Sequence, residues 1–296
     1  IAENDVNFTQ MDQFATEHKD DSLGNIIADS FVYAVKQAEG DDYKKVDVAL
    51  EPSGTVRDTF QKGELTVSDV FNVSSLGIGA DRVAGYPLVS VYLTGKELKT
   101  VAEIDASVSP IMTTAQLYPS GLSWTYNSNR MILNKVTDTT LVDNVPYTEN
   151  PEVSQIEDDK LYRVVSGLYS AQMLGAVEDT SKGILKITPK DENGNEIKDF
   201  EKQIIHDQSG AEIKEWSALA TYLQSFDKNE KGISQIPSYY ENGSARKVDV
   251  DSKNIIELLK HPNKIALILY AVIIIIVLLV ILFVRALVRR YRRKRA

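Results

Sequence analysis

A run of twenty apolar residues near the C-terminus, Ile265 to Val284, constrains this chain more than any other feature of its sequence. The run contains no charged residue, and the hydroxyl of Tyr270 is its only polar group. A helix of that length spans about 30 Å, which is the hydrocarbon thickness of a bilayer. Because the run is apolar on every face, it indicates a membrane-spanning helix rather than a helix buried in a protein core.

Basic residues are concentrated directly after this run. Residues 285–296 carry six Arg and one Lys without any acid, whereas only Lys260 and Lys264 lie close to the other end. Because basic flanks stay in the cytoplasm, we expect a single-pass type I anchor in the cell membrane. The main domain would then be extracellular, and the basic tail would contact anionic lipids of the inner leaflet.

The rest of the chain is acidic. The seven basic residues of the tail leave 26 of the 33 Lys and Arg against all 42 Asp and Glu, so the net charge before the tail is −16. Such a charge disfavours binding of nucleic acid. The absence of Cys excludes disulfides, thiolate metal sites and a Cys nucleophile. Three scattered His argue against a metal centre, so we expect neither metal ligands nor catalytic residues in this chain.

Helical and strand patterns are interleaved along the acidic part. An apolar stripe predicts a helix over residues 23–38, and capping boxes at Thr66–Asp69 and Thr94–Glu97 predict the starts of two more. Strands are expected at 46–50, 88–93, 161–165 and 183–188, and a hairpin at 122–126 and 131–136. Helices are expected at 168–177 and 213–226. Local hairpins among interleaved helices favour an α+β fold over a parallel doubly wound sheet.

We divide the chain into five segments. They are an interdomain connector (1–20), a folded domain (21–227), a juxtamembrane stalk (228–264), the transmembrane helix (265–284) and the cytoplasmic tail (285–296). The sequence starts at Ile1, without Met or a signal peptide. Because an exported domain needs a signal peptide, we expect the chain to be the C-terminal part of a longer precursor.

Five motifs occur in an order that resembles one protein family. They are a helix beginning Leu23-Gly24-Asn25, a strand at 46–50, a turn at Glu51–Arg57, the step Leu93–Leu98 and the stretch Leu117–Leu122. Together they cover about residues 21–190. This pattern resembles the C-terminal, substrate-binding domain of the 5′-nucleotidase family, whose turn ends in the Arg that Arg57 matches.

The resemblance implies a mixed sheet with packed helices, and a two-domain phosphohydrolase of nucleotides. An N-terminal metallophosphoesterase domain of the same precursor would hold two divalent metals, while the C-terminal domain binds a nucleotide or another phosphate ester. The family's metal-binding motifs do not occur in this sequence. We therefore expect this chain alone to be inactive and to bind no metal.

The resemblance also suggests five substrate-binding residues, each with a simpler alternative. Arg57 would offer its planar guanidinium to a phosphate or ribose oxygen, or simply close a turn on the surface. Gly54 would let the backbone approach a ligand, or be an ordinary turn residue. Gln116 stands where the family stacks an aromatic ring on the base, and Tyr118 is a nearby aromatic that could equally pack in the core. Asp179 would stand for an acid of the family's second loop, or be a solvated carboxylate.

These departures from the family pattern leave a second hypothesis open. A stacking residue is missing at Gln116, and no aromatic residue follows in the loop 174–179. The chain would then be a non-catalytic cell-surface binding module on the same fold. A third hypothesis is a stalk with a purely structural role.

Overall fold

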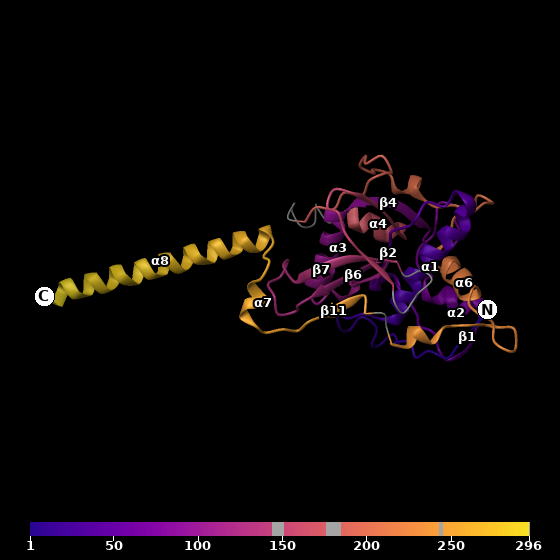
Figure 1. Cartoon of the computed structure of the whole chain (residues 1–296), viewed down its shortest axis with the longest axis horizontal. Helices are drawn as coiled ribbons and strands as arrows, with labels where there is room; N and C mark the ends of the chain where they lie inside the picture. The colour runs from indigo at the N-terminus through magenta and orange to yellow at the C-terminus, as the bar shows by residue number, and fades with distance from the viewer. Residues whose placement is uncertain (144–150, 176–184, 243–244, 296) are drawn as a thin grey trace.

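The computed structural model describes residues 1–143, 151–175, 185–242 and 245–295. Helices and strands form a folded domain, from which one long helix, α8, projects (Figure 1). The N-terminus lies on the side of the domain that faces away from α8 (Figure 1). The domain has mixed sheets with packed helices, so the α+β prediction is confirmed.

The central sheet has four strands in the order β4-β9-β2-β5. Its strands are β2 (Val48–Pro52), β4 (Leu88–Thr94), β5 (Leu117–Ser120) and β9 (Leu161–Gly167). The inner strands β2 and β9 run parallel, and β4 and β5 flank them antiparallel. Both faces of the inner strands are buried, as expected for a parallel pair covered by other elements.

Two further sheets complete the domain. One has the order β11-β6-β7-β8, and the other has the order β10-β1-β3. The first comprises β6 (Leu122–Tyr126), β7 (Val136–Asp143), β8 (Glu152–Gln155) and β11 (Lys247–Asp249). The second comprises β1 (Ala2–Asn4), β3 (Gly63–Leu65) and β10 (Ser234–Gln235). Both sheets therefore join strands that lie far apart in the sequence.

The longest helix of the folded domain is α1 (Ser22–Glu39), which packs against β2, β5 and α6. Asp21 caps its first turn by accepting a hydrogen bond from Leu23 N, and Gly40 follows it with a φ of 53°. The other α-helices are α2 (Val67–Val73), α3 (Gly95–Val108), α4 (Leu168–Gly175), α6 (Glu215–Gln224), α7 (Ile255–Leu259) and α8 (Lys264–Arg295). The short 3₁₀ turns are η1 (Gly40–Asp42), η2 (Ser53–Thr55), η3 (Thr113–Ala115), η4 (Phe200–Gln203) and η5 (Ser238–Asn242).

The two segments that we assigned to a connector and a stalk contribute to the folded domain. Phe8 and Phe14, from residues 1–20, are buried in the core around α1. Ile236 and Tyr240, from residues 228–264, belong to the same core. The domain boundaries at residues 21 and 227 remain predictions. Residues on both sides of each boundary pack into the same core.

Two expected strands differ from the structure. The second hairpin strand, expected at 131–136, begins only at Val136, because Leu133 has a φ of 61° that a strand cannot accommodate. Residues 185–188 of the strand expected at 183–188 form no strand, and residues 183 and 184 lie outside the described part.

The C-terminal helix α8 contains a stretch, Lys264–Tyr291, that is long and apolar enough to cross a membrane. Its mean hydropathy reaches 3.7 and none of its most apolar window is buried against the domain. These properties distinguish it from the core helix of a soluble protein.

Candidate functional site

One edge of the central sheet gathers four loops that are distant in sequence. Strands β2 and β9 are parallel and therefore end at the same edge, at Pro52 and Gly167. The antiparallel strands β5 and β4 begin there, with Leu117 opposite Pro52 and Leu88 opposite Gly167. In sheets that contain parallel strands, ligands bind beyond the carboxyl ends of those strands. We call this edge, with residues 53–57, 84–87, 113–116 and 168–170, the candidate edge.

The turn after β2 is fixed against the turn before β5. Ser53 N donates a hydrogen bond of 2.8 Å to the carbonyl oxygen of Gln116, and Ser53 Oγ donates one of 2.6 Å to that of Thr113. A Cβ atom on Gly54 would lie 2.7 Å from the carbonyl oxygen of Thr114. The close approach of η2 and η3 therefore requires glycine at position 54.

Arg57 lies at the surface of this turn. Its side chain is exposed and donates from Nη2 to the carbonyl oxygen of Gly54, while its amide donates to the carbonyl oxygen of Val73 at 2.9 Å. The turn thus holds the backbone of Arg57 and leaves most of the guanidinium accessible. A planar guanidinium in this position suits an anionic or hydroxyl-rich ligand.

Gln116 and Tyr118 lie beneath the surface instead. Gln116 is 1% exposed and Tyr118 is fully buried, and the Gln116 amide donates to the Tyr118 hydroxyl. The Tyr118 ring packs against Phe14, with 5.4 Å between ring centroids. Burial also raises the pKa of the Tyr118 hydroxyl. Their assignment as ligand contacts stays a prediction, and in this structure both side chains support the loop from below.

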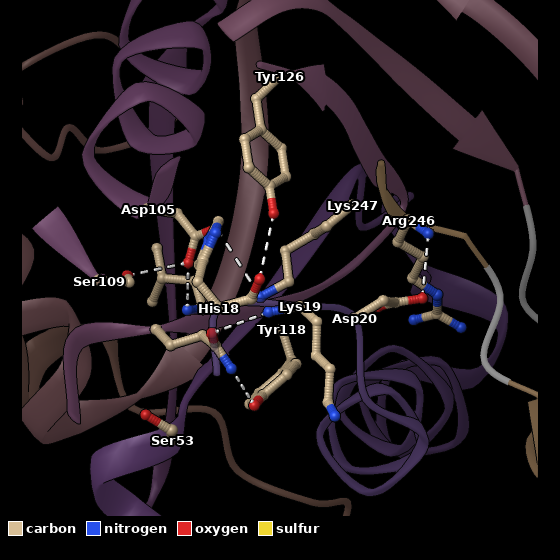
Figure 2. A network of polar contacts seen from close by, with 12 residues as sticks. His18, Lys19, Asp20, Ser53, Asp105, Ser109, Tyr118, Tyr126, Arg246 and Lys247 are labelled. Carbon is tan, nitrogen blue, oxygen red and sulfur yellow. Dashed lines mark hydrogen bonds and ion pairs between the residues drawn. The ribbon is translucent and has the colours of Figure 1, made fainter. Parts of the chain in front are cut away.

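A buried polar network lies behind Tyr118. Figure 2 shows His18 beside Asp105, with Lys247 close to both. His18 Nε2 lies 2.6 Å from Asp105 Oδ2, and Lys247 Nζ lies 3.8 Å from the same oxygen and 4.5 Å from the centre of the Tyr118 ring. Burial alone would raise the pKa of Asp105, but Lys247 and His18 outweigh burial and hold it below its usual value. The network fixes the N-terminal segment, α3 and β11 to one another.

Two buried acids lie below the candidate edge. Glu51, at the end of β2, and Glu215, the first residue of α6, are both fully buried. Burial raises the pKa of Glu51 to about 8, although its hydrogen bond with Thr55 and the charge of Arg57 act in the opposite direction. Burial and the neighbouring Glu51 raise the pKa of Glu215 well above its ordinary value. With 42 acids in the sequence, no pattern distinguished these two.

Two tyrosines form an aromatic surface at the same edge. The rings of Tyr86 and Tyr169 stack with 5.6 Å between centroids and 17° between planes. Tyr169 follows β9 and is 43% exposed, and Tyr86 precedes β4 and is half-buried. Tyr86 carries no motif of its own, and its position just before the expected strand at 88–93 was the one signal in the sequence. Asp179, the fifth predicted site residue, lies outside the described residues.

A groove with a volume of about 1200 Å³ opens at the opposite end of β2 and β5. Asp47 and Gly121 line it there, together with aromatic residues such as Tyr33 and Phe226. None of the four described site predictions lines this groove. The Arg57 turn and this groove thus lie at opposite ends of the central sheet.

A comparison with known protein families identifies the family of this chain. The family described as 5′-nucleotidase, C-terminal domain matches residues 1–177, more than half of the chain. The chain belongs to this family. The resemblance found in the sequence motifs is thereby confirmed.

Individual relatives cover the chain only in part. The trifunctional nucleotide phosphoesterase protein YfkN of Bacillus subtilis (strain 168) is 26% identical over 150 residues, which are 50% of this chain and 9% of that protein. The 5′-nucleotidase precursor from Thermus thermophilus has a similar fold, with a TM-score of 0.54 and 19% identity over 85% of this chain and 39% of that one. A putative 5′-nucleotidase from Staphylococcus aureus aligns at 13% identity with a TM-score of 0.48, over 80% of this chain and 39% of that one. The chain spans less than half the length of each of these relatives.

The divalent metals of this family belong to its N-terminal domain, whereas this chain is the non-catalytic C-terminal domain. Among residues 1–143, 151–175, 185–242 and 245–295, no group of three or more His, Cys, Asp or Glu side chains could hold a metal ion. The residues of this part therefore do not fit a two-metal centre.

Proposed function

We propose that this chain is the substrate-recognition domain of an extracellular, membrane-anchored phosphohydrolase of the 5′-nucleotidase kind. The exposed guanidinium of Arg57 carries the proposal, because it stands at the carboxyl ends of β2 and β9 on a turn that Gly54 keeps close to η3. The family membership of the chain supports the same function.

A division between recognition and bond cleavage has a physical reason. A two-metal centre stabilises the transferring phosphoryl group of any phosphate ester, so it distinguishes poorly between substrates. Contacts to the rest of the substrate must then supply the selectivity. In the proposal, Arg57 provides such a contact, and the metals are held by a metallophosphoesterase domain elsewhere in the same protein.

The proposed location rests on α8 and its charges. The helix is long and apolar enough to span a membrane, and its C-terminal end carries the basic tail. Basic flanks remain cytoplasmic, so the folded domain would lie outside the cell.

One observation favours the alternative of a non-catalytic surface module. Gln116 and Tyr118 are buried, and the rings of Tyr86 and Tyr169 already stack on each other. The stacked rings of Tyr86 and Tyr169 therefore leave no slot between them that would receive a base. A module of this kind would bind a partner or ligand without any hydrolysis.

Hydrolysis by the longer protein that contains this chain tests the proposal. With added Mn²⁺ or Zn²⁺ it should release phosphate from nucleotide monoesters, and Arg57→Ala should raise KM while kcat changes little. Lys62→Ala removes an exposed positive charge elsewhere and should leave both unchanged. A full-length protein with an intact metal domain that turns over no phosphate ester would contradict the proposal and favour the surface module.

A further inference from the structure

The buried acids Glu51 and Glu215 lack the partners that buried carboxylates normally have. Neither side chain is accessible to solvent, and three of their four oxygens have no hydrogen-bond partner in the described part of the chain. An ionised carboxylate in such surroundings is very unfavourable, because burial removes its hydration without replacing it. A buried acid without partners either keeps its proton or holds a cation.

The hydroxyl of Thr55 compensates only in part for the burial of Glu51. Thr55 Oγ1 lies 2.6 Å from Glu51 Oε1 and 2.7 Å from the carbonyl oxygen of Pro52. A threonine hydroxyl has one hydrogen, and a carbonyl oxygen can only accept. Glu51 Oε1 and the carbonyl oxygen of Pro52 therefore compete for this hydrogen, and Glu51 Oε2 has no partner among the described residues. At most one shared hydrogen bond stabilises an ionised Glu51, so burial favours the neutral acid.

The described residues around Glu215 supply no compensating charge. A Cβ atom on Gly167 would lie only 1.6 Å from Glu215 Oε1, so the carboxyl group lies directly on the backbone of the sheet. The adjacent Lys214 does not neutralise it, because its Nζ binds Asp81 at 2.7 Å and Glu212 at 2.5 Å. Among the described residues, Glu51 is the charged group that acts on Glu215.

Arg57 is the cation that acts on Glu51. Of the other groups around Glu51, Tyr118 lies opposite it in the strand register but pairs with Gln116, and Thr55 is uncharged. Glu215, whose carboxyl group lies on Gly167 at the end of the paired strand β9, acts on Glu51 as a like charge when it ionises. Ionisation of Glu51 would therefore create a negative charge at the end of β2 that attracts the guanidinium of Arg57 in the following turn.

We propose that Glu51 and Glu215 form a carboxyl pair that stays protonated at neutral pH and thereby leaves Arg57 free to bind an anionic ligand. Glu51 is a positioning residue, since it acts through Arg57. When alkaline pH removes the proton, the Glu51 carboxylate competes with the ligand for the guanidinium, and the affinity falls. The role toward Arg57 rests on the proposed function, whereas the protonated state does not.

A divalent cation between the two carboxyl groups is the competing explanation. It is less favoured because the described residues bring only two acids together and place Arg57, a positive charge, beside one of them. In that case Ca²⁺ or Mn²⁺ would raise the melting temperature of the wild-type chain but not of Glu51→Gln, and the proposal would be overturned.

Infrared spectroscopy of the 296-residue chain in detergent tests the protonated state. At about pH 7 the chain should show the C=O stretch of a neutral carboxylic acid, which should weaken above about pH 9. Glu51→Gln and Glu215→Gln should each remove part of this band, whereas Glu64→Gln, at an exposed acid, should not. Bands that are identical in all four proteins would overturn the proposal and leave the proposed function untouched.

Calorimetric titration with AMP tests the role toward Arg57. The wild-type affinity should fall about tenfold between about pH 7 and pH 9, although the phosphate of AMP stays largely in its dianionic form in this range. Glu51→Gln resembles the neutral acid in shape and should keep its affinity at both pH values. An equal fall in Glu51→Gln, or none in the wild type, would overturn the role. If AMP does not bind at any pH, the proposed function fails, while the infrared result still decides the protonated state.

Discussion

Arg246 and Asp29 form a bidentate ion pair that is closed off from solvent. Nη1 of Arg246 lies 2.9 Å from Oδ1 of Asp29, and Nη2 lies 2.7 Å from Oδ2. The guanidinium also donates to the carbonyl oxygen of Pro119 at 2.6 Å. Because Asp29 lies in α1 and Arg246 directly precedes β11, the pair attaches the segment that leads to α8 to the core of the domain.

Replacing Arg246 with Met should strongly destabilise the domain. The substitution leaves Asp29 buried without its cation, which typically costs about 3–5 kcal/mol of unfolding free energy. Chemical denaturation of the full chain in detergent measures the change. Lys44→Met breaks an exposed pair with Glu192 and should leave the midpoint unchanged. If Arg246→Met lost as little unfolding free energy as Lys44→Met, the buried pair would not contribute to stability as we expect.

Gly54→Ala should disturb the candidate edge even though the added group is small. The new Cβ would lie 2.7 Å from the carbonyl oxygen of Thr114, so η2 and η3 must separate. We expect a loss of about 1–3 kcal/mol in unfolding free energy, and weaker ligand binding because Arg57 moves with the turn. Thr114→Gly in the same background should not rescue either property, since the main clash is with the backbone. Full recovery of stability and binding in Gly54→Ala/Thr114→Gly would contradict the backbone clash between residues 54 and 114.

The pKa of Glu51 predicts a specific dependence of stability on pH. Its folded-state pKa of about 8 exceeds the ordinary value of 4.5, so between about pH 5 and pH 8 the folded chain binds a proton that the unfolded chain has lost. Stability should therefore fall as pH rises through this window, by about 1 kcal/mol per pH unit, and level off above it. Glu51→Gln should make this slope shallower, and the rest should come from the other buried acids with raised pKa, Glu215 above all. Acids with lowered pKa, such as Asp105 and Glu97, act only at more acidic pH.

The absence of Cys makes the orientation of α8 directly measurable. A single Cys introduced at Ser252 should react with a membrane-impermeant maleimide on intact cells, because that residue belongs to the proposed extracellular side. A Cys introduced at Ala296 should react only after the membrane is permeabilised. Labelling of the second site in intact cells, with the first protected, would reverse the proposed topology.

Local signals in the sequence predicted most of the helices and inner strands. The capping boxes at Thr66 and Thr94 start α2 and α3 as expected, and Asp21 and Gly40 bound α1. Strands β4 and β9 lie within two residues of the expected ranges. Such features depend on neighbouring residues, so the sequence shows them directly.

Features that depend on distant residues were not predictable in this way. Strand β1 pairs with β10, and β11 pairs with the expected strand β6. The strands β1, β10 and β11 lie in the segments that we assigned to a connector and a stalk, because their own composition resembles that of a linker. The same reason explains why the burial of Glu51 and Glu215 escaped detection, since each becomes unusual only when the fold brings them together. At the candidate edge, Arg57 and Gly54 lie in one turn as the motif predicted, whereas the burial of Gln116 and Tyr118 follows from packing against residues 14–24.

Binding of AMP to the 296-residue chain at neutral pH tests the central claim most directly. Calorimetric titration should detect saturable binding to the wild type, and Arg57→Ala should weaken it by about ten- to a hundredfold, as expected for the loss of a charge-assisted hydrogen bond. Arg57→Lys should recover only part of the affinity, because lysine lacks the planar fork. The melting temperature should be the same in all three proteins, since Arg57 is exposed. Equal affinity of the wild type and Arg57→Ala would contradict the account.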